Sequence, residues 1–273
     1  MLRRPIPSSG ELLPVVGLGT YRTFDVAAEH SPDGPREVLR RFHALGGRVV
    51  DTSPMYGHSE TVLGMLARDL GISGDLFFAT KVWARGEQEG RAQINASFEL
   101  LGAHTLDLLQ VHNMVDLRNQ LASLKALKEQ GRVRYIGVTH YLSSRHEDLA
   151  ELVASEALDF VGVNYSLLER NADRHLLPAA ADHGVAVLVN QPFETHSLFG
   201  WVRQASLPDW AGELGIRTWA QFLLKFVLGH PAVTCVLPAT RVLDHLVDNM
   251  GAGAEPLPDP GTRRRMAQYF ADL

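Results

Sequence analysis

The chain of 273 residues contains a single cysteine, Cys235, so no disulfide can form within it. Disulfide-free chains are typical of reducing compartments, and we therefore expect a cytoplasmic protein. Cys235 lies in the apolar run 232–238, which predicts a small buried core residue. No apolar segment follows the arginine pair Arg3 and Arg4, so neither a secretory nor a twin-arginine signal is expected.

Long hydrophobic runs are also missing. No run approaches the roughly 20 apolar residues that a membrane-spanning helix needs, so no membrane association is expected. The net charge of −5 and the pI near 6.2 argue against nucleic acid or an anionic membrane surface as the main partner. No linker, charge block or low-complexity stretch divides the chain, which predicts a single domain over residues 1–273. The sequence does not indicate the oligomeric state.

Motifs for metal binding are missing too. The chain has 12 histidines, but no H-x-H or H-E-x-x-H pattern, and most of them fall in predicted helices or loops. A catalytic metal needs several such ligands converging on one point. A metal-dependent hydrolase is therefore disfavoured, and no metal site is predicted.

What the sequence does contain is a repeated alternation of short apolar runs with longer amphipathic segments. Most runs do not alternate between apolar and polar residues, which indicates strands buried on both faces. The predicted strands are 15–21, 48–51, 76–81, 106–112, 133–140, 158–164, 185–191 and 232–238. Eight strands alternating with helices in a chain of this length predict a closed (β/α)8 barrel, which typically takes about 250 residues. The long connection 191–216 is expected to be a functional loop.

Polar residues follow consecutive predicted strands where each strand ends. Asp51 ends the second strand, Lys81 the third and His112 the fourth, and Tyr56 lies in the loop after the second. Each has an ordinary explanation by itself: Asp51 as a helix cap, Lys81 as a solvated rim residue, His112 as a core histidine and Tyr56 as packing. Because the carboxyl ends of barrel strands share one mouth, the four together point to an active site.

These four side chains suit proton transfer to a carbonyl oxygen. A lysine beside a phenol favours the phenolate, so Lys81 is expected to lower the pKa of Tyr56 towards working pH. Asp51 would keep the lysine charged, and a neutral His112 would polarise the carbonyl. The set contains no nucleophile and no electron source. A reductant must therefore come from a cofactor.

The motifs PVVGLGTY (14–21), DTSPMYG (51–57), FFATKVW (77–83) and LDLLQVHN (106–113) together resemble the aldo-keto reductases, and the likeness runs nearly end to end. The resemblance implies NAD(P)H-dependent reduction of an aldehyde or ketone to an alcohol in a (β/α)8 barrel. Tyr56 would be the general acid, tuned by Lys81 and Asp51, and His112 would orient the carbonyl. A nucleotide-binding barrel that acts as a sensor or partner subunit with little turnover is the alternative.

The resemblance also assigns residues near the reacting atoms. Gly19 and Thr20 belong to a turn that lines the nicotinamide, and Tyr21 follows them where tryptophan is common. Trp83 matches an aromatic residue of the substrate pocket, and Asn113 follows the catalytic histidine as in many bacterial members. The small-molecule carbonyl substrate would therefore meet Tyr21, Trp83 and Asn113.

The residues expected to hold the nicotinamide carboxamide depart from the family pattern. Thr139 and His140 stand where a Ser-Asn pair is usual, and Gly162 stands where a glutamine is usual. Thr139 keeps a hydroxyl, whereas an imidazole cannot present both hydrogen-bonding atoms of an amide. The glycine offers no side chain. This part of the site is where the chain differs most from the family.

The segment after the seventh strand is likewise expected to contact the cofactor, through Asn190, Gln191, Pro192 and Phe193. Asn190 stands where many members stack a tyrosine on the nicotinamide. Phe193 is expected either to supply an aromatic surface in its place or to pack in the core.

The last strand-to-helix junction is expected to hold the adenosine end of the cofactor. The resemblance implies contacts from Ala239, Thr240, Arg241, His245 and Asn249. A helix N-terminus there would attract phosphate, with Thr240 and Arg241 placed for a 2′-phosphate and His245 and Asn249 facing the adenine. Ala239 and His245 replace the usual lysine and arginine, but Arg241 keeps NADP(H) favoured over NAD(H). The missing G-x-G-x-x-G fingerprint is not evidence against a nicotinamide cofactor, because this family does not use it.

Overall fold

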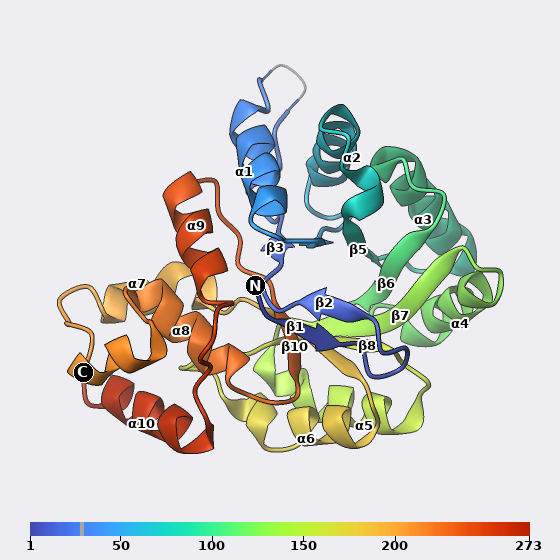
Figure 1. Cartoon of the computed structure of the whole chain (residues 1–273). Helices are drawn as coiled ribbons and strands as arrows, with labels where there is room; N and C mark the ends of the chain where they lie inside the picture. The colour runs from blue at the N-terminus through green and yellow to red at the C-terminus, as the bar shows by residue number, and fades with distance from the viewer. Residues whose placement is uncertain (28–29) are drawn as a thin grey trace.

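The computed structural model describes residues 1–27 and 30–273. Eight parallel strands form one sheet in sequence order, surrounded by helices (Figure 1). The strands are β3 (Leu18–Gly19), β4 (Val49–Asp51), β5 (Phe77–Val82), β6 (Leu106–His112), β7 (Val133–His140), β8 (Phe160–Asn164), β9 (Ala186–Asn190) and β10 (Val233–Val236). Each one overlaps a predicted strand, so the alternation in the sequence located all eight.

The two edges of this sheet meet, which closes the barrel. Val16 forms a parallel bridge with Val236. The backbone N–H of Gly17 donates to the Val236 carbonyl at 2.9 Å, and that of Gly19 donates to the Pro238 carbonyl at 3.0 Å. A Cβ on Gly17 would lie 2.7 Å from a Leu237 methyl carbon, so glycine permits this close approach. The predicted (β/α)8 barrel is confirmed.

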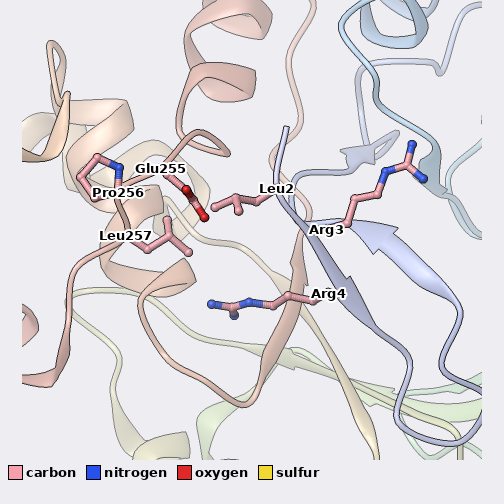
Figure 2. Close-up of a pocket in the computed structure, with 6 residues that line it drawn as sticks. All are labelled: Leu2, Arg3, Arg4, Glu255, Pro256 and Leu257. Atoms are coloured by element: carbon pink, nitrogen blue, oxygen red, sulfur yellow. The ribbon is translucent and has the colours of Figure 1, made fainter.

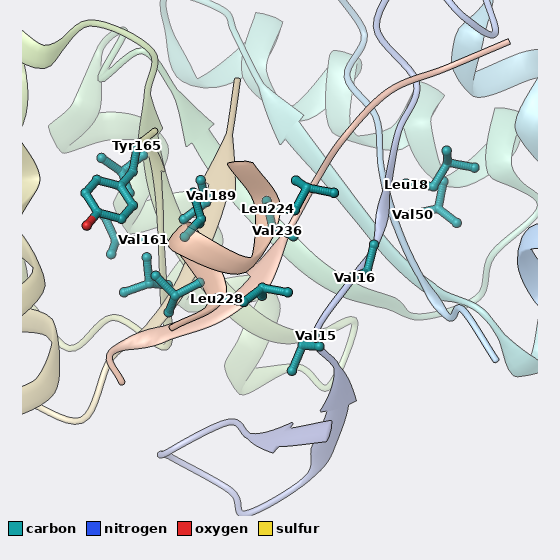
Figure 3. Packing of buried hydrophobic residues seen from close by; sticks show 14 of the residues in the cluster. Val15, Val16, Leu18, Val50, Val161, Tyr165, Val189, Leu224, Leu228 and Val236 are labelled. Atoms are coloured by element: carbon teal, nitrogen blue, oxygen red, sulfur yellow. The ribbon is translucent and has the colours of Figure 1, made fainter. Parts of the chain in front are cut away.

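Helices cover the outside of the barrel. They are α1 (Asp33–Ala44), α2 (Ser59–Asp69), α3 (Glu87–Leu101), α4 (Leu117–Glu129), α5 (His146–Ser155), α6 (Leu176–Asp182), α7 (Ser197–Trp201), α8 (Trp219–Leu228), α9 (Leu243–Gly251) and α10 (Pro260–Ala271). Outward-facing strand residues such as Val50, Val161 and Val189 belong to one apolar cluster with helix residues such as Leu224 and Leu228 (Figure 3). The long connection after β9 contains α7 and two short 3-10 turns. No helix in residues 1–27 or 30–273 is long and apolar enough to span a membrane.

A second core fills the inside of the barrel. Phe77, Tyr135 and Phe160 stack there with ring centroids 5.6 to 6.0 Å apart. Cys235 belongs to this inner cluster and is fully buried, which confirms the prediction of a core residue. These bulky residues lie near the beginnings of their strands. The opposite end of the barrel, where the strands terminate, is therefore left to polar side chains.

A hairpin of β1 (Arg3–Pro5) and β2 (Leu12–Pro14), which the sequence did not predict, closes the other end of the barrel. It crosses the middle of the ring of helices in Figure 1. Ile6 and Leu13 of the hairpin region join the inner core cluster. The hairpin is held at the beginnings of β7 and β8, where Ser9 accepts a hydrogen bond from Tyr135 at 2.7 Å. The hairpin therefore covers the end of the barrel at which the strands begin.

A surface pocket lies at this closed end, between Leu2, Arg3 and Arg4 of the N-terminus and the segment 255–257 (Figure 2). The guanidinium of Arg4 donates to the carbonyl oxygens of Leu228 at 2.6 Å and His230 at 2.9 Å. Arg4 thus satisfies carbonyl groups at the end of α8. The pocket is a gap beside a structural contact, remote from the mouth.

Candidate active site

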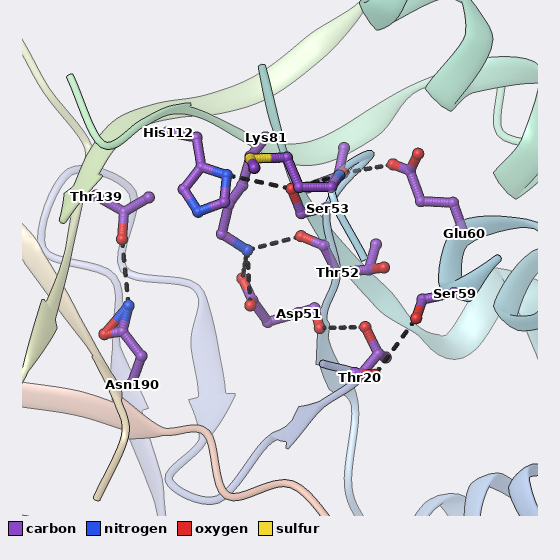
Figure 4. A network of polar contacts seen from close by, with 12 residues as sticks. Thr20, Asp51, Thr52, Ser53, Ser59, Glu60, Lys81, His112, Thr139 and Asn190 are labelled. Atoms are coloured by element: carbon purple, nitrogen blue, oxygen red, sulfur yellow. Dashed lines mark hydrogen bonds and ion pairs between the residues drawn. The ribbon is translucent and has the colours of Figure 1, made fainter. Parts of the chain in front are cut away.

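Asp51 and Lys81 form a buried ion pair at the mouth of the barrel (Figure 4). Asp51 is the last residue of β4 and Lys81 lies near the end of the adjacent β5. The Lys81 ammonium donates to the two carboxylate oxygens at 2.8 and 2.7 Å and to the Thr52 carbonyl at 2.6 Å. These bonds to Asp51 and Thr52 fix the position of the positive charge.

Tyr56 lies over this ion pair. Its ring centroid is 5.1 Å from Lys81 Nζ and 5.0 Å from the ring of Tyr21. The His112 ring meets it edge-on, with centroids 6.1 Å apart and an interplanar angle of 84°. The structure therefore brings together the four residues Asp51, Tyr56, Lys81 and His112 that the sequence placed at one mouth.

The pKa values of these groups follow from burial and from the ion pair. Burial raises the pKa of the Tyr56 hydroxyl, and the opposing effect of Lys81 does not overcome it. The expectation that Lys81 brings this pKa down to working pH is therefore corrected, because desolvation of the phenolate is the larger effect. Burial by itself would lower the pKa of Lys81, but Asp51 and Tyr56 raise it above its ordinary value. At neutral pH Lys81 is charged and Tyr56 keeps its proton.

His112 is a neutral imidazole at the end of β6. Burial, with the nearby positive charge of Lys81, lowers its pKa to about 3. Its Nδ1 lies 3.2 Å from the hydroxyl of Ser53, a fully buried residue of the loop after β4. Sequence reasoning missed Ser53, although it stands two residues after Asp51 inside the motif DTSPMYG.

The loop that carries Tyr56 is held by side chains at its base. Ser59 Oγ donates to the Tyr56 carbonyl at 2.7 Å. Thr20 Oγ1 donates to the Asp51 carbonyl at 3.0 Å. Ser59 is the first residue of α2, which has no side-chain cap bond at its N-terminus. Its hydroxyl instead fixes the turn that presents Tyr56.

Below the ion pair, amide side chains line the barrel interior. Gln110 on β6 is fully buried and its Oε1 has no hydrogen-bond partner among the described residues. Asn190 Nδ2 donates to Thr139 Oγ1 at 3.3 Å, and within the same part of the chain Asn190 Oδ1 is also without a partner. A Cβ on Gly162 would lie 2.4 Å from Thr139 Oγ1 and 3.0 Å from Gln110 Oε1. The space of the missing side chain at 162 is thus taken by Thr139 and Gln110.

His140 lies apart from this group. Successive residues of a strand point to opposite faces, so Thr139 and His140 on β7 cannot both face the interior. His140 Nδ1 accepts the backbone N–H of Leu142 at 3.1 Å, and its ring stacks on Tyr141 with centroids 5.5 Å apart. Thr139 is instead hydrogen-bonded to Asn190. The contacts of Thr139 and His140 with a cofactor stay a prediction.

Comparison with known proteins identifies the chain. The sequence profile of the Aldo/keto reductase family matches residues 15–264. The chain belongs to this family. The NADH-specific methylglyoxal reductase of Escherichia coli K12 is 26% identical over 254 residues, which cover 81% of this chain and 76% of that protein. Pyridoxine 4-dehydrogenase of the same organism is 27% identical over 238 residues, 79% of each chain.

Solved structures show the same fold. An aldo-keto reductase of Klebsiella pneumoniae in complex with NADPH has a TM-score of 0.82 at 24% identity, covering 99% of this chain and 96% of that one. The protein is therefore an oxidoreductase of the aldo/keto reductase family with a (β/α)8 barrel. No group of three or more His, Cys, Asp or Glu side chains suited to a metal ion occurs in the part of the chain that the structure describes.

Of the residues expected to contact substrate in this aldo/keto reductase, Tyr21 packs against Tyr56, with ring centroids 5.0 Å apart. Tyr21 and Trp83 are 48% and 41% exposed, which makes them apolar surfaces open to a ligand. Asn113 follows His112 with a positive φ of 54°, and its Oδ1 is buried without a partner among the described residues. The three come from the loops after β3, β5 and β6, on one side of the mouth.

The segment after β9 is divided between site and core. Asn190 and Gln191 are half-buried, and Gln191 has a positive φ of 50°. Pro192 and Phe193 are buried, and the Phe193 ring packs against Phe199 with centroids 4.9 Å apart. Of the two roles expected for Phe193, the structure favours core packing.

The junction between β10 and α9 offers backbone N–H groups to solvent. Val242 precedes α9 without a side-chain cap, and Thr240 Oγ1 accepts the Val242 N–H at 3.0 Å. Arg241 and His245 are exposed beside this helix N-terminus, whereas Asn249 is buried, with 3% exposure. A Cβ added to Gly19 would lie 3.4 Å from the Cβ of the half-buried Ala239. The glycine-rich turn and this junction are therefore neighbours.

Proposed function

We propose that the protein reduces an aldehyde or ketone to an alcohol with NADPH, and that Tyr56 is the general acid. One observation carries the proposal: the Tyr56 ring centroid lies 5.1 Å from the Lys81 ammonium, which Asp51 holds through two hydrogen bonds. A protonated phenol next to a fixed positive charge can give up its proton during the reaction, because the resulting phenolate is stabilised in place.

The lining residues fit a nicotinamide carboxamide. Gln110 Oε1 and Asn190 Oδ1 are buried acceptors without donors among the described residues. A carboxamide NH2 provides two donors, and buried acceptors gain stability when they are paired. Thr139 Oγ1 lies between these two side chains, bonded to Asn190 and close to Gly162. Gln110 and Asn190 therefore substitute for the contacts that Gly162 and His140 cannot make.

Reduced nicotinamide, when bound, supplies the hydride for the carbonyl carbon. Tyr56 donates its proton to the carbonyl oxygen, and Lys81 stabilises the phenolate that remains. Asp51 holds Lys81 in place. His112 is neutral, with its pKa lowered to about 3, so it can donate a hydrogen bond to the carbonyl oxygen without itself protonating the substrate at neutral pH.

NADPH is proposed over NADH because of the β10–α9 junction. Arg241 is exposed beside uncapped N–H groups of α9, an arrangement that attracts phosphate. The Klebsiella pneumoniae structure contains NADPH, whereas the Escherichia coli relative is named NADH-specific. The apolar surfaces of Tyr21 and Trp83 suit a carbonyl compound with an aromatic or other apolar substituent.

The test is consumption of NADPH with an activated aldehyde such as 4-nitrobenzaldehyde, comparing the wild type with Tyr56→Phe. We expect the variant to lose roughly 10²- to 10⁴-fold in kcat, the usual contribution of a general acid. NADPH binding, followed by the change in its fluorescence, should stay close to that of the wild type. Binding of NADPH by both proteins, with no rate in the wild type above that of Tyr56→Phe, would instead support the nucleotide-binding sensor.

A further inference from the structure

The contact between Ser53 and His112 constrains which nitrogen of the imidazole carries the proton. Ser53 is 0% exposed, and its Oγ lies 3.2 Å from His112 Nδ1. The same oxygen accepts the backbone N–H of Met55 at 3.2 Å. Among the described residues, no other hydrogen bond is formed by this hydroxyl.

Two proton arrangements are compatible with these distances. In the first, the Ser53 hydroxyl donates to an unprotonated Nδ1, and the imidazole proton is on Nε2. In the second, Nδ1–H donates to Ser53 Oγ, which leaves the hydroxyl proton without an acceptor in a fully buried position. A buried donor that lacks an acceptor costs free energy, so the first arrangement is favoured. The Met55 N–H occupies one lone pair of Oγ in both arrangements, so the choice depends on the hydroxyl proton.

We propose that Ser53 is a positioning residue that fixes His112 in the Nε2–H tautomer, with Nε2–H directed to the substrate oxygen. The inference rests on the proposed carbonyl reduction for its catalytic meaning, but the tautomer is a property of the free protein. The neutral state of His112 makes the choice matter, because a neutral imidazole has only one N–H to donate.

The Ser53 hydroxyl also fixes the orientation of the His112 ring. Ser53 belongs to the loop of Tyr56, since the Tyr56 N–H donates to the Ser53 carbonyl at 3.0 Å. One residue therefore couples the proton donor Tyr56 to the hydrogen-bond donor His112. The sequence motif DTSPMYG contains both ends of this coupling, Ser53 and Tyr56.

The experiment measures the ¹⁵N shifts of the histidine side chains in the uniformly labelled free protein. His112→Gln identifies the resonances of His112. In the wild type, Nδ1 should show the shift of an unprotonated nitrogen and Nε2 that of a protonated one, at every pH from 6 to 8. A protonated Nδ1 in the wild-type spectrum overturns the proposal, whatever the enzyme activity.

Variants extend the test. Ser53→Ala should move both shifts towards those of a tautomer mixture and lower kcat roughly ten-fold, in line with the loss of one hydrogen bond, while the KM for NADPH is unchanged. Ser53→Thr keeps the hydroxyl and should restore the wild-type shifts. Ser97→Ala is the control, because it removes another fully buried serine hydroxyl, on α3, that has no contact with His112. It should change neither the His112 shifts nor kcat.

Unchanged His112 shifts in a folded Ser53→Ala protein would also overturn the proposal. The test of the His112 tautomer and the test of carbonyl reduction can fail independently of each other. A wild type that reduces no carbonyl but shows the Nε2–H tautomer would refute the reaction and keep the role of Ser53. A wild type that reduces carbonyls but has a protonated Nδ1 would keep the reaction and refute the role of Ser53.

Discussion

Lys81 Nζ lies 2.8 and 2.7 Å from the two carboxylate oxygens of Asp51, and both side chains are almost completely buried. Burying two charges costs more than burying apolar groups, so this pair is not expected to be the most stable filling of the barrel. The Tyr56 ring, 5.1 Å from Lys81 Nζ, explains why the pair is nevertheless useful. The positive charge of Lys81 lies beside the position at which the Tyr56 phenolate would form.

Removing one partner of this pair should destabilise the fold. Lys81→Met leaves the Asp51 carboxylate buried and unpaired, and we expect a loss of about 3 to 5 kcal/mol in the free energy of unfolding. The double variant Lys81→Met with Asp51→Asn removes both charges and should recover part of that loss. Urea denaturation of the three proteins measures the difference. Equal stability of the single variant and the wild type would contradict the prediction and would show that the barrel accommodates Asp51 without Lys81.

Gly162 should be intolerant of even one added carbon. A Cβ there would lie 2.4 Å from Thr139 Oγ1 and 2.7 Å from Thr139 Cβ, so Gly162→Ala must displace β7 or its side chains. We expect a loss of about 1 to 3 kcal/mol in stability, as is usual for overpacking, and weaker NADPH binding because Gln110 and Thr139 move.

The matched control for this substitution is Gly74→Ala, because a Cβ at Gly74 would meet nothing within 4 Å. Denaturation and NADPH fluorescence titration follow both variants. If Gly162→Ala binds NADPH as the wild type does, Gln110 and Thr139 do not form the carboxamide subsite.

The sequence located the barrel and the four neighbouring residues Asp51, Tyr56, Lys81 and His112 because both depend on simple regularities. Long buried strands have a recognisable composition, and Asp51, Lys81 and His112 stand at strand ends, where polar residues are conspicuous. Gln110 escaped notice because it lies inside the run LDLLQVH, where a polar side chain reads as part of a core strand. The proposed role of Gln110 depends on the missing side chain at Gly162, 52 positions away in the sequence. Only the folded barrel brings these two residues together.

Other features depended on geometry that composition does not encode. The strands β1 and β2 have three residues each, too few for a hydrophobic period to be read. The opposite orientations of Thr139 and His140 in the free protein were not anticipated, although neighbouring residues on one strand face opposite sides. Ser53 was hidden because a serine in a turn has an ordinary local explanation. These omissions concern how residues are oriented, whereas the predicted positions of the strands were sound.

Arg241 should determine the preference for NADPH over NADH. The 2′-phosphate is the group that distinguishes the two cofactors, and Arg241 is an exposed cation at the uncapped start of α9. We expect Arg241→Ala to raise the Kd for NADPH roughly ten-fold or more, the value of one charge-assisted hydrogen bond, and to leave the Kd for NADH unchanged.

Arg264→Ala, which removes an exposed arginine from α10, is the control for the change in net charge. Fluorescence titrations with both cofactors provide the measurement. An equal loss of affinity for NADPH and NADH would assign Arg241 to a part of the cofactor that the two share.

His230 should make the fold less stable in mild acid. Burial, with the nearby charge of Arg263, lowers its pKa to about 4, and Asp173, 3.6 Å from its Nε2, does not compensate. In the unfolded chain the pKa is about 6.5, so between these values the unfolded state binds more protons. Stability is therefore fully present above pH 6.5 and is lost as the pH falls towards 4. The expected slope is at most about 1.4 kcal/mol per pH unit, reduced by solvent at the open side of the ring.

The matched variant is His230→Gln, which cannot take up this proton and lies outside the proposed active site. It should be less stable than the wild type at pH 7.5, because the ring packs edge-on against Tyr165 with centroids 6.1 Å apart. As the pH falls from 7 to 5, the gap in the free energy of unfolding should narrow by up to about 2 kcal/mol. Other titrating groups, His112 among them, cancel in this comparison, since both proteins contain them. Urea denaturation at pH 7 and pH 5 measures the gap, and a constant gap would mean that His230 titrates alike in the folded and unfolded states.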